Sequence, residues 1–107
     1  MNIPQIQIHE AKKKLDEKNC LFVDIRDPGS YESAHIPGAV RLHDANVQEF
    51  LENTDKNAEI VVYCYHGNSS LSATVYLVEN GFKNVASMSG GFEAWRQLYK
   101  HEAGESF

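Results

Sequence analysis

The sequence predicts an α/β fold: one domain with a central, mainly parallel five-stranded sheet flanked by helices on both faces. Strand-like and helix-like segments alternate along the 107 residues, and this alternation is typical of parallel sheets. A chain of this length usually forms a single domain. Its 42% of hydrophobic residues are enough for a packed core. We therefore expect one domain over residues 1–107, with an ordered core at about 4–100 and a frayed tail at 101–107.

Five short apolar segments predict the strands. They are residues 6–8, 21–25, a short strand at the end of 35–40, 59–64 and 84–88. The clearest is 59–64, Glu-Ile-Val-Val-Tyr-Cys, because a continuous apolar run is typical of a central strand that is covered on both faces. A turn at 27–29, Asp-Pro-Gly, follows the second strand.

Apolar residues at helical spacing predict the helices between these strands. The expected helices are His9 or Glu10 to about Lys18, Ser30 to Ala34, about Ala45 to Leu51, the segment that opens at Ser69-Ser70, and 92–99. In the first helix, Ala11 and Leu15 lie four residues apart and face inward. In the last helix, Phe92, Trp95 and Tyr99 share one face, so we assign all three to the core.

The fourth helix has the strongest pattern. Leu71, Val75, Val78 and Phe82 follow helical spacing and predict its apolar face. Asn80-Gly81 predicts where it stops, because glycine readily takes the left-handed conformation that follows a last helical turn.

Charge and hydropathy exclude several classes of protein. A formal net charge of −5 is unlike a nucleic-acid binder, whose contact face is basic. The one basic cluster, Lys12 to Lys14, is expected on an exposed helix face. No apolar run is long enough to span a membrane, and the first ten residues do not resemble a signal peptide. We expect a cytoplasmic monomer that binds neither nucleic acid nor membrane.

The two cysteines, Cys20 and Cys64, are too few for a disulfide scaffold. No Cys-x-x-Cys pair is present and the five histidines are scattered, so no metal site is expected. Cys20 opens an apolar strand and is interpreted as a small buried hydrophobe.

Cys64 stands between the central strand and the cysteine loop, residues 65–70, which leads into the fourth helix. The first backbone N–H groups of a helix have no partner within it, and the helix dipole adds partial positive charge there. Gly67 and Asn68 would let the loop curl so that several N–H groups point at one sulfur. Such donors favour a thiolate, the nucleophilic form of cysteine. The alternative is a structural cysteine that happens to end a strand.

Three motifs then resemble one family. Residues 64–70, CYHGNSS, resemble the active-site loop of rhodanese-type sulfurtransferases. Residues 23–40, VDIRDPGSYESAHIPGAV, resemble the family's upstream signature, and residues 89–95, SGGFEAW, resemble its C-terminal Gly-Gly-x-x-x-Trp signature. The likeness extends over most of the chain. It is greatest to the small, single-domain bacterial thiosulfate sulfurtransferases.

The resemblance implies a reaction. The Cys64 thiolate would take the outer sulfur of thiosulfate as a persulfide, release sulfite, and pass the sulfur to cyanide or to a small dithiol protein such as thioredoxin, without a cofactor. Backbone N–H groups of the cysteine loop would bind the substrate; they belong to Tyr65, His66, Gly67, Asn68, Ser69 and Ser70. Many rhodaneses carry Arg or Lys in this loop. None occurs here, which predicts weak binding of a dianion.

Three residues outside the loop receive supporting roles. Asp24 and Arg26 close the second strand, and we interpret them as a structural ion pair, with Glu32 as a further candidate partner of Arg26. The alternative places the pair beside the cysteine loop, where it would orient the backbone. His35 is expected to fix a loop by hydrogen-bonding backbone.

Two other functions compete. Cysteine-dependent phosphatases and arsenate reductases use Cys, five residues, then Arg, whose guanidinium grips two phosphate oxygens. Ser70 occupies that Arg position here, which disfavours phosphate as substrate. The second rival is a non-catalytic rhodanese-like module that binds a protein partner. Inactive modules usually lack the cysteine, so the presence of Cys64 favours an enzyme.

Overall fold

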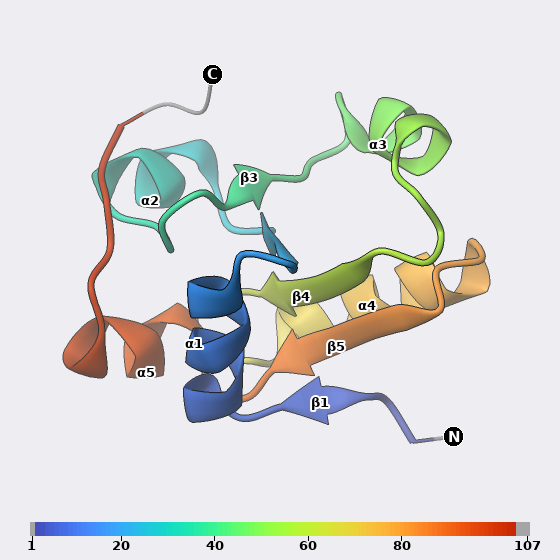
Figure 1. Ribbon diagram of the computed structural model, residues 1–107. Coiled ribbons are helices and arrows are strands. Elements are labelled where there is room, and N and C mark those ends of the chain that lie inside the picture. The colour runs from blue at the N-terminus through green and yellow to red at the C-terminus, as the bar shows by residue number, and fades with distance from the viewer. Residues whose placement is uncertain (1, 105–107) are drawn as a thin grey trace.

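The computed structural model describes residues 2–104 and shows one five-stranded sheet (Figure 1). Its strands are β1 Gln5–Ile6, β2 Leu21–Asp24, β3 Val40–Arg41, β4 Glu59–Tyr63 and β5 Asn84–Met88. They lie in the order β1-β5-β4-β2-β3, and every neighbouring pair is parallel. The predicted fold class is confirmed, and the sheet is wholly parallel.

Five helices connect and cover the strands. They are α1 Ile8–Glu17, α2 Pro28–Ser33, α3 Val47–Asn53, α4 Ser69–Glu79 and α5 Gly91–Leu98. α1 and α5 pack on one face of the sheet, and α3 and α4 pack on the other, while α2 lies beside β3 at one edge (Figure 1). Helices therefore flank both faces, as predicted.

The core consists of two apolar layers, one on each face of the sheet. β4 contributes to both because its side chains alternate: Val61 and Tyr63 point toward α1 and α5, and Ile60 and Val62 point toward α3 and α4. Trp95 of α5 is fully buried in the first layer. A strand that is buried on both faces needs a continuous apolar run, which explains why 59–64 was the clearest strand in the sequence.

Several predicted elements differ from the structure by one or two residues at their ends, and two differences are larger. The first strand was expected at 6–8, but α1 begins at Ile8 because the Gln7 carbonyl accepts the Ala11 N–H and the Glu10 carboxylate accepts the Gln7 N–H. The predicted apolar face of α4 is buried only in part: Val78 is 42% exposed, whereas Phe82, just after the helix, is 2% exposed.

The buried residues of α4 each come one residue before a position of the predicted apolar face. They are Ser70, Thr74 and Leu77. This orientation places the Ser70 hydroxyl 3.3 Å from Cys64 Sγ. α4 does end where Asn80-Gly81 predicts, and Gly81 has a φ of +96°.

The segment that follows α5 is more ordered than the sequence suggests. Residues 101–104 were expected to fray, yet His35 and Glu102 exchange backbone hydrogen bonds of 2.8 and 2.9 Å. The Gly104 N–H also donates to the Glu32 carbonyl at 2.8 Å. This part of the tail is therefore paired with the end of α2. Residues 105–107 lie outside the described residues.

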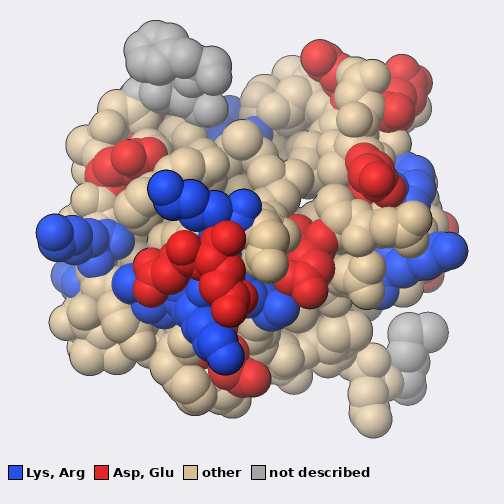
Figure 2. Space-filling model, viewed as in Figure 1, with Lys and Arg blue, Asp and Glu red and all other residues tan. Residues whose placement is uncertain are grey.

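Charged side chains are mixed over the face that carries α1, where Figure 2 shows basic and acidic groups side by side. Lys12 and Lys14 of the predicted basic cluster form ion pairs with Asp16 and Glu59. Within residues 2–104 no helix is long and apolar enough to cross a membrane, and no cluster of His, Cys, Asp and Glu could hold a metal ion.

Candidate functional site

Cys64 directly follows the central strand β4 and is only 6% exposed. In the parallel sheet, Asp24 of β2 is the register partner of Tyr63 in β4, so the residues after both strands meet at one edge. This is the carboxyl edge, where open α/β sheets form their sites.

The cysteine loop wraps around the sulfur. The backbone N–H groups of Gly67 and Ser70 donate to Cys64 Sγ at 3.1 and 3.3 Å. Gly67 has a φ of +97°, and a Cβ at this position would lie 3.0 Å from the Gly90 nitrogen, so the curl of the loop depends on glycine. Two N–H groups of the cysteine loop therefore point at the Cys64 sulfur.

Two serine hydroxyls extend this polar environment into the core. The Ser70 Oγ lies 3.3 Å from Cys64 Sγ and 2.7 Å from the Oγ of Ser87 in β5. Both serines are almost completely buried. The sulfur therefore has a hydroxyl partner on its buried side and backbone donors around it.

The start of α5 holds the cysteine loop from the other side. The N–H groups of Phe92 and Glu93 donate to the carbonyls of Cys64 and Tyr65, each at 2.9 Å. Gly91 makes this approach possible, because a Cβ there would lie 2.5 Å from the Tyr65 oxygen and 2.7 Å from the Cys64 oxygen. The Gly-Gly pair of the third motif thus positions the cysteine by close backbone contact.

These contacts decide the charge of the thiol. Burial by itself raises the pKa of Cys64, but hydrogen bonds from the Ser70 hydroxyl and from the N–H groups of Ser70 and Gly67 outweigh burial. The pKa of Cys64 therefore lies below that of an ordinary thiol. Cys20 has the opposite environment: burial raises its pKa to about 11.

The two cysteines should therefore react at different pH. At about pH 8, below the ordinary thiol pKa of about 8.5, we expect iodoacetamide to alkylate Cys64 at least about tenfold faster than Cys20, because the thiolate is the nucleophile. The rate at Cys64 should rise with pH and level off at a lower pH than the rate at Cys20. Peptide mass mapping at several pH values measures both rates. Equal rates would contradict the assigned electrostatics.

Asp24 and Arg26 form a buried ion pair close to the loop. The Arg26 guanidinium contacts both Asp24 carboxylate oxygens, at 2.7 to 3.1 Å, and its Nη2 also donates to the Ala34 carbonyl at 2.6 Å. It lies 4.2 Å from the centre of the Phe92 ring. Among the described residues, the ion-pair partner of Arg26 is Asp24 and not Glu32. The pair joins β2, the loop before β3 and α5, and the Arg26 guanidinium also lies 5.8 Å from the Tyr65 ring of the cysteine loop, so both interpretations stay predictions.

His35 fixes a loop, as the sequence predicted. Its buried Nδ1 lies 2.6 Å from the Tyr31 carbonyl oxygen, and its ring stacks on the Tyr31 ring at 3.9 Å. Its Nε2 lies 3.3 Å from a carboxylate oxygen of Glu102. These contacts connect α2 to the C-terminal segment, and none of them involves Cys64.

The remaining residues of the cysteine loop are exposed; they are Tyr65, His66, Asn68 and Ser69. Tyr65 is 41% exposed, and its ring lies 5.1 Å from the His66 ring. Asn68 and Ser69 are exposed and begin α4, where the Asn68 carbonyl accepts the Leu71 N–H at 3.2 Å. Contact of Tyr65, His66, Asn68 and Ser69 with a substrate stays a prediction.

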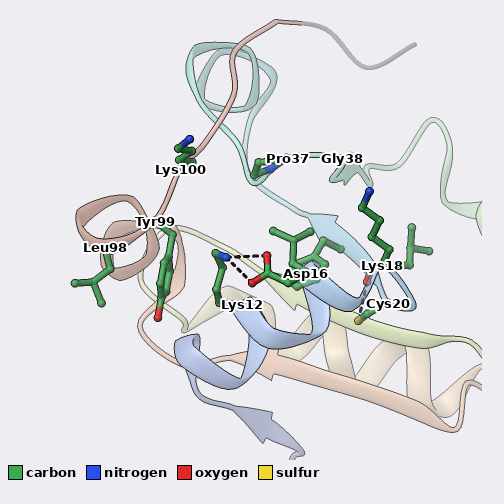
Figure 3. Close-up of a pocket in the computed structure, with 12 residues that line it drawn as sticks. Lys12, Asp16, Lys18, Cys20, Pro37, Gly38, Leu98, Tyr99 and Lys100 are labelled. Atoms are coloured by element: carbon green, nitrogen blue, oxygen red, sulfur yellow. Dashed lines mark hydrogen bonds and ion pairs between the residues drawn. The ribbon is translucent and has the colours of Figure 1, made fainter.

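A cavity that is separate from the cysteine loop lies away from Cys64. It has a volume of about 810 Å³ and is lined by α1, the start of β2 and the end of α5. Figure 3 shows its polar rim, where Lys12 contacts Asp16, with Cys20 on one side. Leu21 opens β2, so this cavity is at the amino edge of the sheet, opposite the cysteine loop. None of its lining residues belongs to that loop.

Two site residues were not identified from the sequence. Ser87 is a buried serine in the strand Asn-Val-Ala-Ser-Met, and a polar residue at an inward position is a signal that could have been noticed. Gly91 belongs to the Gly-Gly-x-x-x-Trp motif at residues 89–95, but the sequence alone assigned it no role at the site. A pair of adjacent glycines before a helix can indicate close backbone approach, but the sequence does not say which backbone.

Fold and site together define an α/β domain with an activated cysteine at the carboxyl edge of a parallel sheet. A family model described as "Rhodanese-like domain" matches residues 7–98, and the chain therefore belongs to the rhodanese-like family.

Relatives and solved structures agree with this family. The thiosulfate sulfurtransferase GlpE of Pseudoalteromonas translucida is 42% identical over 95% of this chain and 97% of its own. GlpE of Pseudomonas entomophila is 48% identical over 90% and 88%. The Alr3790 protein of Anabaena has a TM-score of 0.81 at 28% identity, and the match covers 92% of each chain. A thiosulfate sulfurtransferase of Pseudomonas aeruginosa has a TM-score of 0.87 at 25% identity over 99% of this chain and 20% of its own.

Proposed function

We propose that this protein is a thiosulfate sulfurtransferase with Cys64 as its nucleophile. The observation that carries the proposal is the buried Cys64 sulfur, which receives N–H donors from Gly67 and Ser70. The names of the GlpE relatives, which match nearly the full length of the chain, supply the substrate. A thiolate held in this way attacks soft electrophiles such as the outer sulfur of thiosulfate.

The first half-reaction loads the enzyme. The Cys64 thiolate attacks the outer sulfur of thiosulfate, and a new sulfur–sulfur bond forms on Sγ. The original bond between the two thiosulfate sulfurs breaks, and its electron pair leaves with sulfite. The outer sulfur stays on Cys64 as a persulfide anion. N–H groups of residues 65–70 offset the negative charge of thiosulfate and then of the persulfide.

The second half-reaction unloads it. An acceptor, either cyanide or the thiolate of a small dithiol protein, attacks the terminal persulfide sulfur. The bond to Cys64 Sγ breaks, and its electron pair returns to Cys64 as thiolate. With cyanide the product is thiocyanate. The cycle restores the starting enzyme and needs no cofactor or external redox partner.

We place this chemistry in the cytoplasm. Cys64 and Cys20 are both free thiols, and a catalytic thiolate persists most readily where thiols are kept reduced. A reducing compartment also supplies the small dithiol proteins that would accept the sulfur.

Intact-mass spectrometry tests the proposal directly. Incubation with excess thiosulfate should add the mass of one sulfur atom, peptide mapping should place it on Cys64, and later addition of cyanide should remove it. Incubation without thiosulfate is the control. Sulfur found on Cys20 alone, or a mass that thiosulfate does not change, would refute the mechanism.

The phosphatase alternative is weakened by the position of Ser70. In a phosphatase, an arginine at this position would project toward the bound anion. The Ser70 side chain is instead fully buried and hydrogen-bonded to Cys64 and Ser87. The site thus presents backbone donors and hydroxyls to a sulfur centre, without the bidentate cation that phosphate transfer requires.

A further inference from the structure

A buried chain of hydroxyl groups leads from the sheet to the reactive sulfur. Ser87 is 1% exposed and Ser70 is 0% exposed. Their Oγ atoms are 2.7 Å apart, and the Ser70 Oγ is 3.3 Å from Cys64 Sγ. The layer around them is mostly apolar, with Val85 and Leu77 among the members of its core. Burying a hydroxyl in such a layer is costly unless it is hydrogen-bonded.

The side chain of Ser87 has no other partner in the described part of the chain. Its Oγ bonds only to the Ser70 Oγ, while its backbone N–H is used separately by the Pro4 carbonyl at 2.9 Å. The Ser70 hydroxyl, in contrast, has two neighbours, Cys64 and Ser87. A hydroxyl carries one proton, so Ser70 donates to one neighbour at a time.

We propose that Ser87 is a positioning residue that directs the Ser70 hydroxyl proton toward Cys64. When Cys64 is a thiolate, Ser87 donates to Ser70 and Ser70 donates to the sulfur. When Cys64 is a thiol or a persulfide, its Sγ carries no full negative charge. The two hydroxyl groups then rotate about their C–O bonds, and the Ser70 proton points toward Ser87. The heavy atoms stay where they are, so the polar environment follows the charge on sulfur with little reorganisation.

This role rests on the proposed sulfur transfer and extends it to both half-reactions. In the first, the donated proton stabilises the attacking thiolate. In the second, Cys64 Sγ is the leaving group that regains an electron pair, and a leaving thiolate of lower basicity departs faster. Ser87 therefore assists both steps through Ser70, without contact with the substrate.

The pH dependence of thiolate formation tests this role, measured by ultraviolet absorbance and by alkylation of the free enzyme. Below the thiol pKa, we expect Ser87→Ala to lower the thiolate fraction about two- to tenfold, the range set by one ordinary hydrogen bond. Ser70→Ala removes the direct donor and should lower that fraction about ten- to a hundredfold. Adding Ser87→Ala to Ser70→Ala should cause no further change.

Thr74→Val is the matched control, because the Thr74 hydroxyl is equally buried in α4 but donates to the Ser70 carbonyl at 2.8 Å and not toward the sulfur. It should leave the profile unchanged. If Ser87→Ala does not fold, Ser87→Thr and Ser87→Val provide a pair of equal shape, and only Val should lower the fraction. A Ser87→Ala profile that superimposes on the wild type, or an equal effect with and without the Ser70 hydroxyl, would overturn the proposal. These measurements need no thiosulfate, so they are independent of whether sulfur transfer occurs.

Discussion

Cys64→Ser should abolish transfer of sulfur from thiosulfate to cyanide. A serine hydroxyl at this position would keep the hydrogen bonds of the loop, but it remains protonated near neutral pH and cannot hold a persulfide. We expect thiocyanate production to fall by at least about a thousandfold, the scale of loss when a covalent nucleophile is removed. Colorimetric assay of thiocyanate with thiosulfate and cyanide measures the rate.

Cys20→Ser is the control for this experiment, because it removes the other free thiol at a half-buried position outside the site. It should keep the rate within about twofold of the wild type, in line with a surface or half-buried change away from the chemistry. The same pair of variants separates an enzyme from a non-catalytic binding module. Equal rates for the wild type and Cys64→Ser would eliminate sulfur transfer through Cys64.

The fold could be predicted because its strongest determinants are local. Residues 84–88 are predicted and observed with the same bounds, since Gly81 stops the preceding helix and an apolar run follows. The central strand was equally clear because a parallel strand between two helical layers must be apolar on both sides. The wrong boundary at Ile8 has a local cause as well: an apolar residue beside a strand extends the strand pattern, while the contacts between Gln7 and Glu10 start the helix.

The part of the site within one loop could also be predicted. Cys64, Gly67 and Ser70 lie within seven consecutive residues, so strand, loop and helix patterns suffice to bring them together. Ser87 and Gly91 reach the site through packing between elements. Their contribution depends on how α4 is rotated on the sheet and how closely α5 approaches, and no pattern of residue types in one sequence specifies either.

The tail shows the same limit. His101 to Gly104 has no apolar periodicity, and the pattern therefore indicates fraying. The segment is held by backbone pairing with His35 and Glu32, residues that are about seventy positions earlier. Backbone hydrogen bonds of this kind are available to almost any residue type, so the composition of the tail does not reveal them.

Gly91→Ala should destabilise this protein strongly, although it adds only one methyl group. Gly91 has a φ of +60°, and a Cβ there would lie 2.5 to 2.7 Å from backbone atoms of Tyr65 and Cys64. None of these atoms belongs to a side chain that can turn away, so α5 must move, and the hydrogen bonds from Phe92 and Glu93 to the cysteine loop must break or lengthen. Backbone strain and overpacking together should lower the free energy of unfolding by about 2 to 5 kcal/mol.

Gly38→Ala separates the two causes. Gly38 has a φ of +80°, but nothing lies within 4 Å of where its Cβ would be. This variant carries only the backbone strain and should lose about 1 to 2 kcal/mol. Urea unfolding followed by circular dichroism measures both losses, and alkylation of Cys64 in the folded state reports on the loop. Because only Gly91 touches the loop, only Gly91→Ala should also shift the pH profile of Cys64 alkylation upward. If both variants lose the same stability and keep the wild-type profile, the close approach of α5 does not position the cysteine.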